Sequence, residues 1–122
     1  MQHARSYLQC CGRYIEGGLL LVAPDAESLM RSRYTAYVRG QDAYLIATWH
    51  ASRRPADFVT DAGTKWLGLE VRDVRLQDST HAEVEFVARM RHPGGQASRL
   101  RERSRFVHEE DGRWYYVDGD LR

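Results

Sequence analysis

Apolar positions in the first half of the chain recur at helical spacing, up to about residue 62. The clearest helix is predicted within residues 23–40, because both of its ends carry signals. Asp25 can cap the N-terminus and Glu27 lies in the first turn, while Arg39 lies in the last turn and Gly40 follows as a stop. Its apolar side chains form one broad face, which predicts burial against another layer.

Two shorter helices are expected to follow. Residues 41–50 predict a helix that is capped by Asp42 and ends at His50. Residues 54–63 predict a third short helix, with Pro55 in its first turn, where a proline is tolerated.

From Trp66 onward the apolar period becomes two, which is the period of β-strands. The alternation slips by one residue near Arg72 and Asp73, which indicates a β-bulge that bends the first strand. Turn residues separate the runs, so four strands are predicted, over residues 66–78, 81–92, 98–108 and 113–118.

The alternation also constrains the hairpin loops. The even-numbered apolar faces of the second and third strands coincide only if their loop has an odd number of residues. For the last hairpin, a three-residue loop that ends at Gly112 turns Trp114 and Tyr116 inward, and a four-residue loop turns Tyr115 and Val117 inward. The Glu-Asp-Gly sequence favours the first, since it suits a type I turn followed by a G1 bulge.

Helices followed by a bent antiparallel meander predict an α+β fold. We expect the N-terminal helices to pack in the concave face of a curved sheet of about four strands, which makes a cone with a pocket at its open end. On the outer face, Glu85 should lie opposite Arg103 or Arg105. This pairing favours a solvated charge ladder over a nucleic-acid-binding stripe. Formation of a homodimer through the outer face of the sheet stays an open alternative.

Composition adds few constraints. The chain has 122 residues and a net charge of +1, so it fits one domain and is not expected to bind nucleic acid. It has no apolar run of the roughly 18 residues that a membrane span needs. Its two cysteines, Cys10 and Cys11, are adjacent, and adjacent cysteines rarely bond to each other. These features favour a reducing compartment, and we expect the cytoplasm.

Several segments carry a resemblance to a known family: APDAESLMRSRYTAYV, YLIATWH, WLGLEV and ERSRFVHEEDGRWYYVDG. In this combination the chain resembles the bacterial YchJ-type family of uncharacterised proteins, from about Tyr7 to Gly119. The resemblance implies a nuclear transport factor 2-like domain, which we assign to residues 17–122.

The same resemblance explains the adjacent cysteines. The family often begins with a SEC-C zinc motif, and YLQCC at residues 7–11 is similar to its second half, so residues 1–16 are interpreted as a truncated or degenerate remnant. The chain either starts inside the motif or has lost part of it. Tetrahedral zinc needs four ligands, so Cys10 and Cys11, even with His3, are expected to bind zinc weakly or not at all. No cofactor is expected unless the complete motif is present.

Glu102 is the most informative candidate for chemistry. Its alternation places a carboxylate on the core side of a strand, and a buried carboxylate must be paired or protonated. We expect it to be largely buried and to accept hydrogen bonds from Arg31 or Arg33. This arrangement is either a structural bridge between helix and sheet or a polar pocket floor, and the two are compatible.

Other pocket candidates are His50, Asp118 and several aromatic residues. His50 either stabilises a helix end or forms an acid–base pair with Asp118 or Glu102. The aromatic residues either fill the core or bind a flat apolar ligand; those proposed for the pocket are Tyr37, Trp49 and Tyr116.

Two functions remain open. The first is a non-enzymatic module that binds a small molecule or a protein. The second is a small enzyme, such as an isomerase or dehydratase, that uses the cone pocket. The sequence has no evident acid–base constellation, which favours the binding module.

Overall fold

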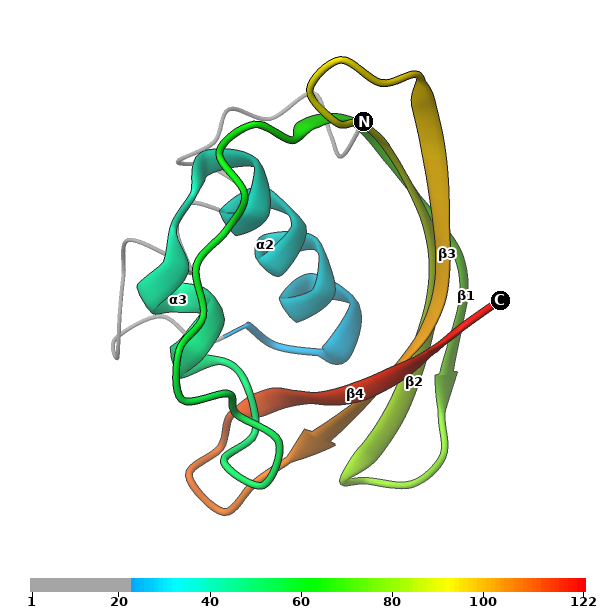
Figure 1. Ribbon diagram of the computed structural model, residues 1–122. Helices are drawn as coiled ribbons and strands as arrows, with labels where there is room; N and C mark the ends of the chain where they lie inside the picture. Colours follow the sequence, from blue (N-terminus) through cyan, green and yellow to red (C-terminus); the bar gives the residue numbers. More distant parts are fainter. Residues whose placement is uncertain (1–22) are drawn as a thin grey trace.

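The computed structural model describes residues 23–122, and it contains two helices and a four-stranded sheet (Figure 1). Helix α2 spans Ala26–Arg39 and α3 spans Asp42–Ala47. The strands are β1 (Lys65–Leu76), β2 (His81–Arg91), β3 (Ala97–His108) and β4 (Trp114–Leu121). All neighbouring strands are antiparallel, in the order β1-β2-β3-β4. The predicted α+β architecture is therefore confirmed.

The ends of α2 follow the sequence signals. Asp25 accepts a hydrogen bond from the backbone N–H of Ser28 at 2.7 Å, which satisfies one of the free donors of the first turn. Gly40 ends the helix in the left-handed conformation, with φ of 67°, which a residue without a Cβ adopts at little cost.

The segment after α3 differs from the prediction. The third helix predicted within residues 54–63 is wrong, because this stretch is irregular in the structure. Phe58 from this segment packs edge-on against Tyr37 and Trp49, so an aromatic contact takes precedence over local helix propensity. His50 also does not end a helix, since α3 ends three residues earlier.

The sheet curves around α2 and places it in the concave face (Figure 1). The predicted bulge near Arg72 is confirmed, and a second irregularity lies between Trp66 and Gly68. Bulges increase local twist, so two of them bend β1 around the helix. Core side chains from α2 and the inner face of the sheet meet there, and they include Leu29, Met30, Leu69, Val84, Ala88 and Phe106.

The loop predictions hold. The β2–β3 loop runs from residue 92 to residue 96, because Arg91 pairs with Ala97, and its length is odd as expected. In the last hairpin, Glu109 N–H donates to Arg113 O, and Gly112 has φ of 81°, as a G1 bulge requires. Trp114 and Tyr116 therefore turn toward the core.

A parallel bridge joins Trp49 to Tyr116 and closes the cone on one side. His50 N–H donates to Tyr116 O at 2.7 Å, and Tyr116 N–H donates to Thr48 O at 2.9 Å. The segment after α3 is therefore attached to the free edge of β4. Neither helix within residues 23–122 is long and apolar enough to cross a bilayer.

Candidate functional site

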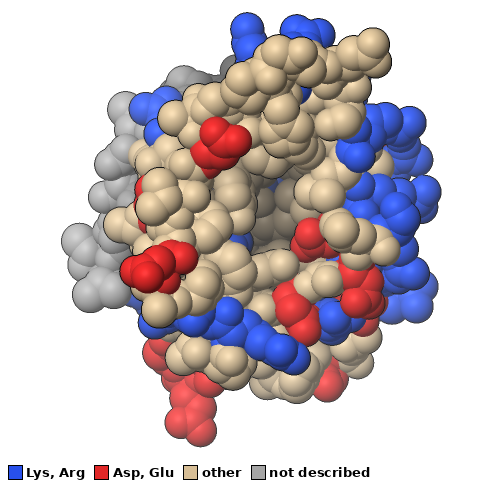
Figure 2. Space-filling view, viewed as in Figure 1, with Lys and Arg blue, Asp and Glu red and all other residues tan. Residues whose placement is uncertain are grey.

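A cavity of about 270 Å³ lies between α2 and the concave face of the sheet. It opens to the outside as the hollow near the centre of Figure 2. Its walls are mainly aromatic and aliphatic, and its charged side chains are Arg33 and Glu102. The lining residues are Met30, Arg33, Tyr34, Tyr37, Trp66, Phe86, Ala88, Leu100, Glu102, Ser104, Phe106 and Tyr116.

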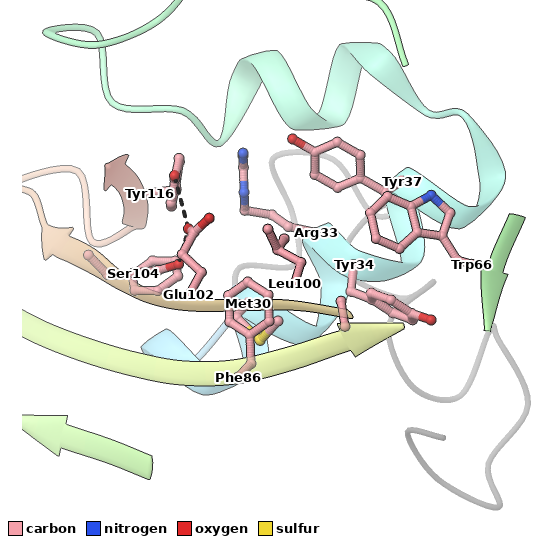
Figure 3. Close-up of a pocket in the computed structure, with 12 residues that line it drawn as sticks. Met30, Arg33, Tyr34, Tyr37, Trp66, Phe86, Leu100, Glu102, Ser104 and Tyr116 are labelled. Atoms are coloured by element: carbon pink, nitrogen blue, oxygen red, sulfur yellow. Dashed lines mark hydrogen bonds between the residues drawn. The ribbon is translucent and has the colours of Figure 1, made fainter. Parts of the chain in front are cut away.

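The cavity has an aromatic end and a polar end (Figure 3). At the aromatic end, Trp66 lies between Tyr34 and Tyr37, and its ring centroid is 5.7 Å from each of theirs. Burial raises the pKa of Tyr37 above its ordinary value, although the nearby Arg33 opposes this shift. Tyr37 therefore presents a neutral hydroxyl at neutral pH.

Glu102 lies at the polar end, on the inner face of β3 as its alternation predicts. Its Oε2 accepts hydrogen bonds from the Ser104 hydroxyl at 2.6 Å and from the Tyr116 hydroxyl at 3.2 Å. Burial raises the pKa of Tyr116, and the negative charge of Glu102 adds to the shift, so the phenol keeps its proton and acts as a donor. Glu102 is half-buried rather than largely buried.

Arg33 is the buried cation of the site, with only 5% of its surface exposed. Its Nη1 donates to Leu45 O at 2.8 Å and to the Thr48 hydroxyl at 2.6 Å. The guanidinium also contacts two rings that meet edge-to-face beside it, since its Cζ lies 4.7 Å from the centroid of Tyr116 and 5.1 Å from that of Trp49. Burial lowers its pKa, but from an ordinary value so high that the group stays charged at neutral pH.

The predicted hydrogen bonds from Arg31 or Arg33 to Glu102 are wrong. Arg33 uses Nη1 on acceptors in and after α3, which the sequence could not place beside it. Arg31 pairs instead with Glu27, one helical turn away, at 3.0 Å. Glu102 therefore forms no ion pair within residues 23–122, and its hydrogen-bond donors there are hydroxyl groups.

Two other candidates lie outside the cavity. His50 contacts the Ser52 hydroxyl through Nδ1 at 2.7 Å and Glu109 through Nε2 at 3.3 Å, beside a second, shallower cavity. Asp118 accepts one hydrogen bond from Arg105 on the outer face of the sheet. The structure therefore does not join His50, Asp118 and Glu102 into an acid–base pair.

A bulge explains the position of Asp118. Phe106 pairs with Tyr116 and Arg105 pairs with Asp118, so Val117 is an extra residue in β4. The extra residue reverses the alternation, which turns Asp118 outward and Gly119 inward. A Cβ at Gly119 would lie 2.3 Å from Oε2 of Glu102, so the glycine leaves room for the carboxylate.

Comparison with known proteins identifies the family. The profile of the family described as "YchJ, middle NTF2-like domain" matches residues 25–119. The chain belongs to this family. UPF0225 proteins are its relatives: one from Polaromonas sp. is 65% identical over 117 residues, which cover 96% of this chain and 84% of the relative. Another, from Bordetella pertussis, is 58% identical over 119 residues, which cover 97% of this chain and 88% of the relative.

Two solved structures of similar proteins share the fold of this chain. The solution structure of RPA3114, described as a SEC-C motif containing protein from Rhodopseudomonas palustris, matches with a TM-score of 0.84 and 32% identity. The match covers 98% of this chain and 94% of that one. A crystal structure of a SEC-C motif containing protein from Psychrobacter arcticus matches with a TM-score of 0.81 and 28% identity, over 100% and 77% of the two chains. The nuclear transport factor 2-like fold is thus confirmed.

The zinc-motif remnant predicted at Cys10 and Cys11 lies outside the described residues. Across the part of the chain that the structure describes, no three His, Cys, Asp or Glu side chains are grouped to hold a metal ion.

Of the eight residues proposed for the pocket, Arg33, Tyr37, Glu102 and Tyr116 line the cavity. Trp49 packs behind it, against Tyr116 and Arg33. Trp66, the second residue of β1, supplies one wall and was not predicted from the sequence. Phe86, Leu100 and Ser104 were not predicted to line the pocket either, although alternation and strand pairing already placed them on the same face of the sheet as Glu102.

Proposed function

We propose that this protein is a binding module that holds a small, largely apolar molecule in the cone cavity. The observation that supports the proposal is a cavity of about 270 Å³ with aromatic walls and the carboxylate of Glu102. Among the described residues, no cation forms an ion pair with this carboxylate. A structural carboxylate in a packed core would be expected to have an ionic partner. Ligand pockets commonly combine apolar walls with a few such polar groups.

The cavity size limits the ligand. A cavity of roughly 150 Å³ can hold one benzene molecule, so this cavity of about 270 Å³, which opens to the outside, has room for two fused rings with a small head group. Aromatic walls favour a flat body, since ring pairs gain about 0.5–1.5 kcal/mol beyond the area that they bury. A cytoplasmic location is part of this proposal, and the adjacent pair Cys10 and Cys11 supports it.

The proposal is tested with naphthalene as an apolar probe, followed by amide chemical shifts in solution. We expect saturable shifts for residues that line the cavity, such as Trp66, Phe86 and Leu100. Leu100→Trp fills the cavity and should abolish them. Val59→Trp is the matched control, because Val59 is 79% exposed and lies outside the lining. Naphthalene shifts that spread over the surface, or that survive in Leu100→Trp, would contradict the proposal.

A further inference from the structure

The opposite charges that line the cavity, Glu102 and Arg33, face the same space without touching (Figure 3). No nitrogen of Arg33 lies within 4.0 Å of a Glu102 oxygen, since the ion pairs of the described residues do not include this one. Such a gap is unusual for a half-buried carboxylate beside a buried guanidinium, because direct contact would be favourable in a site of low polarity.

Both groups keep hydrogen-bonding capacity that the described residues do not use. The two hydrogen bonds that Glu102 accepts from them both end on Oε2, which leaves Oε1 as an open acceptor. Arg33 has five N–H donors, and two on Nη1 bind Leu45 O and the Thr48 hydroxyl. The Tyr37 hydroxyl is a further hydrogen-bond partner of the guanidinium, which still leaves donors that the described residues do not use. The polar end of the cavity therefore presents an acceptor on Glu102 and a donor on Arg33 to the same space.

The surroundings keep the two groups apart. Arg33 is held by its hydrogen bonds to Leu45 O and the Thr48 hydroxyl and by its contacts with the rings of Tyr116 and Trp49. Glu102 is held by two hydroxyl groups, and Gly119 provides the space for its side chain. Neither side chain can move toward the other without losing these contacts, so the couple is preorganised.

We propose that the ligand carries a neutral head group with an adjacent donor and acceptor, such as a primary amide or a lactam edge. This inference rests on the proposed function. The head group would donate to Oε1 of Glu102 and accept from the guanidinium of Arg33, while its flat body lies toward Trp66. A cationic head would be attracted by Glu102 but repelled by Arg33, and an anionic head the reverse, so a neutral head fits a couple whose charges cancel.

Four probes with one aromatic body test the head group: naphthalene, naphthamide, naphthoate and naphthylmethylammonium, with all heads at the same ring position. Affinities come from amide chemical shifts of the wild-type protein. We expect naphthamide to bind at least about tenfold more tightly than the other three. It adds two hydrogen bonds, and in each of them the protein partner is charged. Equal affinity for naphthamide and naphthalene, or a preference for either charged probe, would overturn the inference and leave the proposed function standing. If none of the four binds, the proposed function fails and the inference fails with it.

Glu102→Gln checks the role of the carboxylate. The glutamine carbonyl can keep the bonds from Ser104 and Tyr116, and its NH₂ group then faces the cavity as a donor. We expect the preference to move from naphthamide to naphthoate, with the affinity for naphthalene unchanged, which also shows that the cavity is intact. Glu85→Gln on the outer face is the matched control and should change neither preference. An unchanged preference for naphthamide in Glu102→Gln would contradict the inference.

Discussion

Gly119 and Glu102 are in such close contact that a Cβ on the glycine would meet the carboxylate, 2.3 Å from Oε2 and 2.8 Å from Cγ. The two residues lie on neighbouring strands, and the bulge at Val117 brings the glycine to the inner face. The polar end of the cavity thus depends on the absence of a side chain at position 119.

Gly119→Ala should therefore destabilise the protein by about 1–3 kcal/mol, because Glu102 must leave the hydroxyls of Ser104 and Tyr116. Chemical denaturation measures this loss. Gly68→Ala is the matched control, since it lies in β1 and its added Cβ would meet nothing within 4 Å. Similar losses in both variants would mean that the cost reflects strand backbone and not the carboxylate.

Arg33→Lys should lower the free energy of unfolding by about 2 kcal/mol. A lysine keeps the charge but lacks the planar fork that donates to Leu45 O and Thr48 together and that contacts both rings. Hydrogen bonds to charged groups contribute about 1.5–3 kcal/mol. Arg72→Lys is the control, because its pair with Glu70 is exposed and should contribute less than about 1 kcal/mol. Thermal and chemical unfolding of both variants would show the difference, and equal losses would contradict the role given to Arg33.

Stability should fall in acid partly through the outer face of the sheet. A hydrogen bond from Arg103 lowers the pKa of Glu83 below its ordinary value of 4.5, and one from Arg101 does the same for Glu85. Carboxyl groups with a lowered pKa stabilise the fold above the unfolded value, and this stabilisation is lost as the pH falls through the folded value.

We therefore expect the unfolding midpoint to drop as the pH falls below about 4.5. Glu83→Gln should make this dependence shallower, whereas Glu110→Gln, in the exposed turn before β4, should leave it unchanged. If the unfolding midpoint depends on pH with the same slope in the wild type and in Glu83→Gln, the ion pairs of the outer face do not contribute to the acid sensitivity.

The outer face also has an unfavourable pair. Arg89 lies directly opposite Arg99, and within the described residues neither forms an ion pair. Like charges directly opposite each other destabilise a sheet, so Arg89→Glu should stabilise the protein by about 0.5 kcal/mol at low salt.

Arg75→Glu provides the opposite case, because position 75 faces Glu83 and the change places two acids together. It should destabilise the protein, and high salt should reduce both effects. A stabilising effect of Arg75→Glu, or a loss of stability in Arg89→Glu, would contradict this assignment of cross-strand partners.

Much of the fold was predictable because its signals are local. The ends of α2 depend on Asp25 and Gly40, and the last hairpin depends on Gly112, which are residues with a known backbone preference. Strand faces followed from alternation, which placed Glu102 and Tyr116 inside before any contact was known.

The predictions failed where a single residue, or a contact with a residue distant in sequence, determines the position of a side chain. A single extra residue at Val117 reversed the face of Asp118, and alternation alone cannot locate such a bulge. The pairing of Arg33 depended on Leu45 O and Thr48, whose approach is a matter of tertiary packing. On the outer face, the predicted pairing of Glu85 with Arg103 is confirmed, but Arg105 pairs with Asp118 and Asp120 of β4.

The bridge between Trp49 and Tyr116 has a consequence for self-association. An open sheet edge is a template on which another chain can add a strand, and β4 is the last strand of this sheet. The segment at Thr48–His50 occupies the backbone groups of Tyr116 and so covers the start of that edge. At the opposite edge, β1 is irregular at two points, which is a poor template for a straight partner strand. The covered start of β4 and the irregular β1 thus both disfavour the addition of a strand from a second chain.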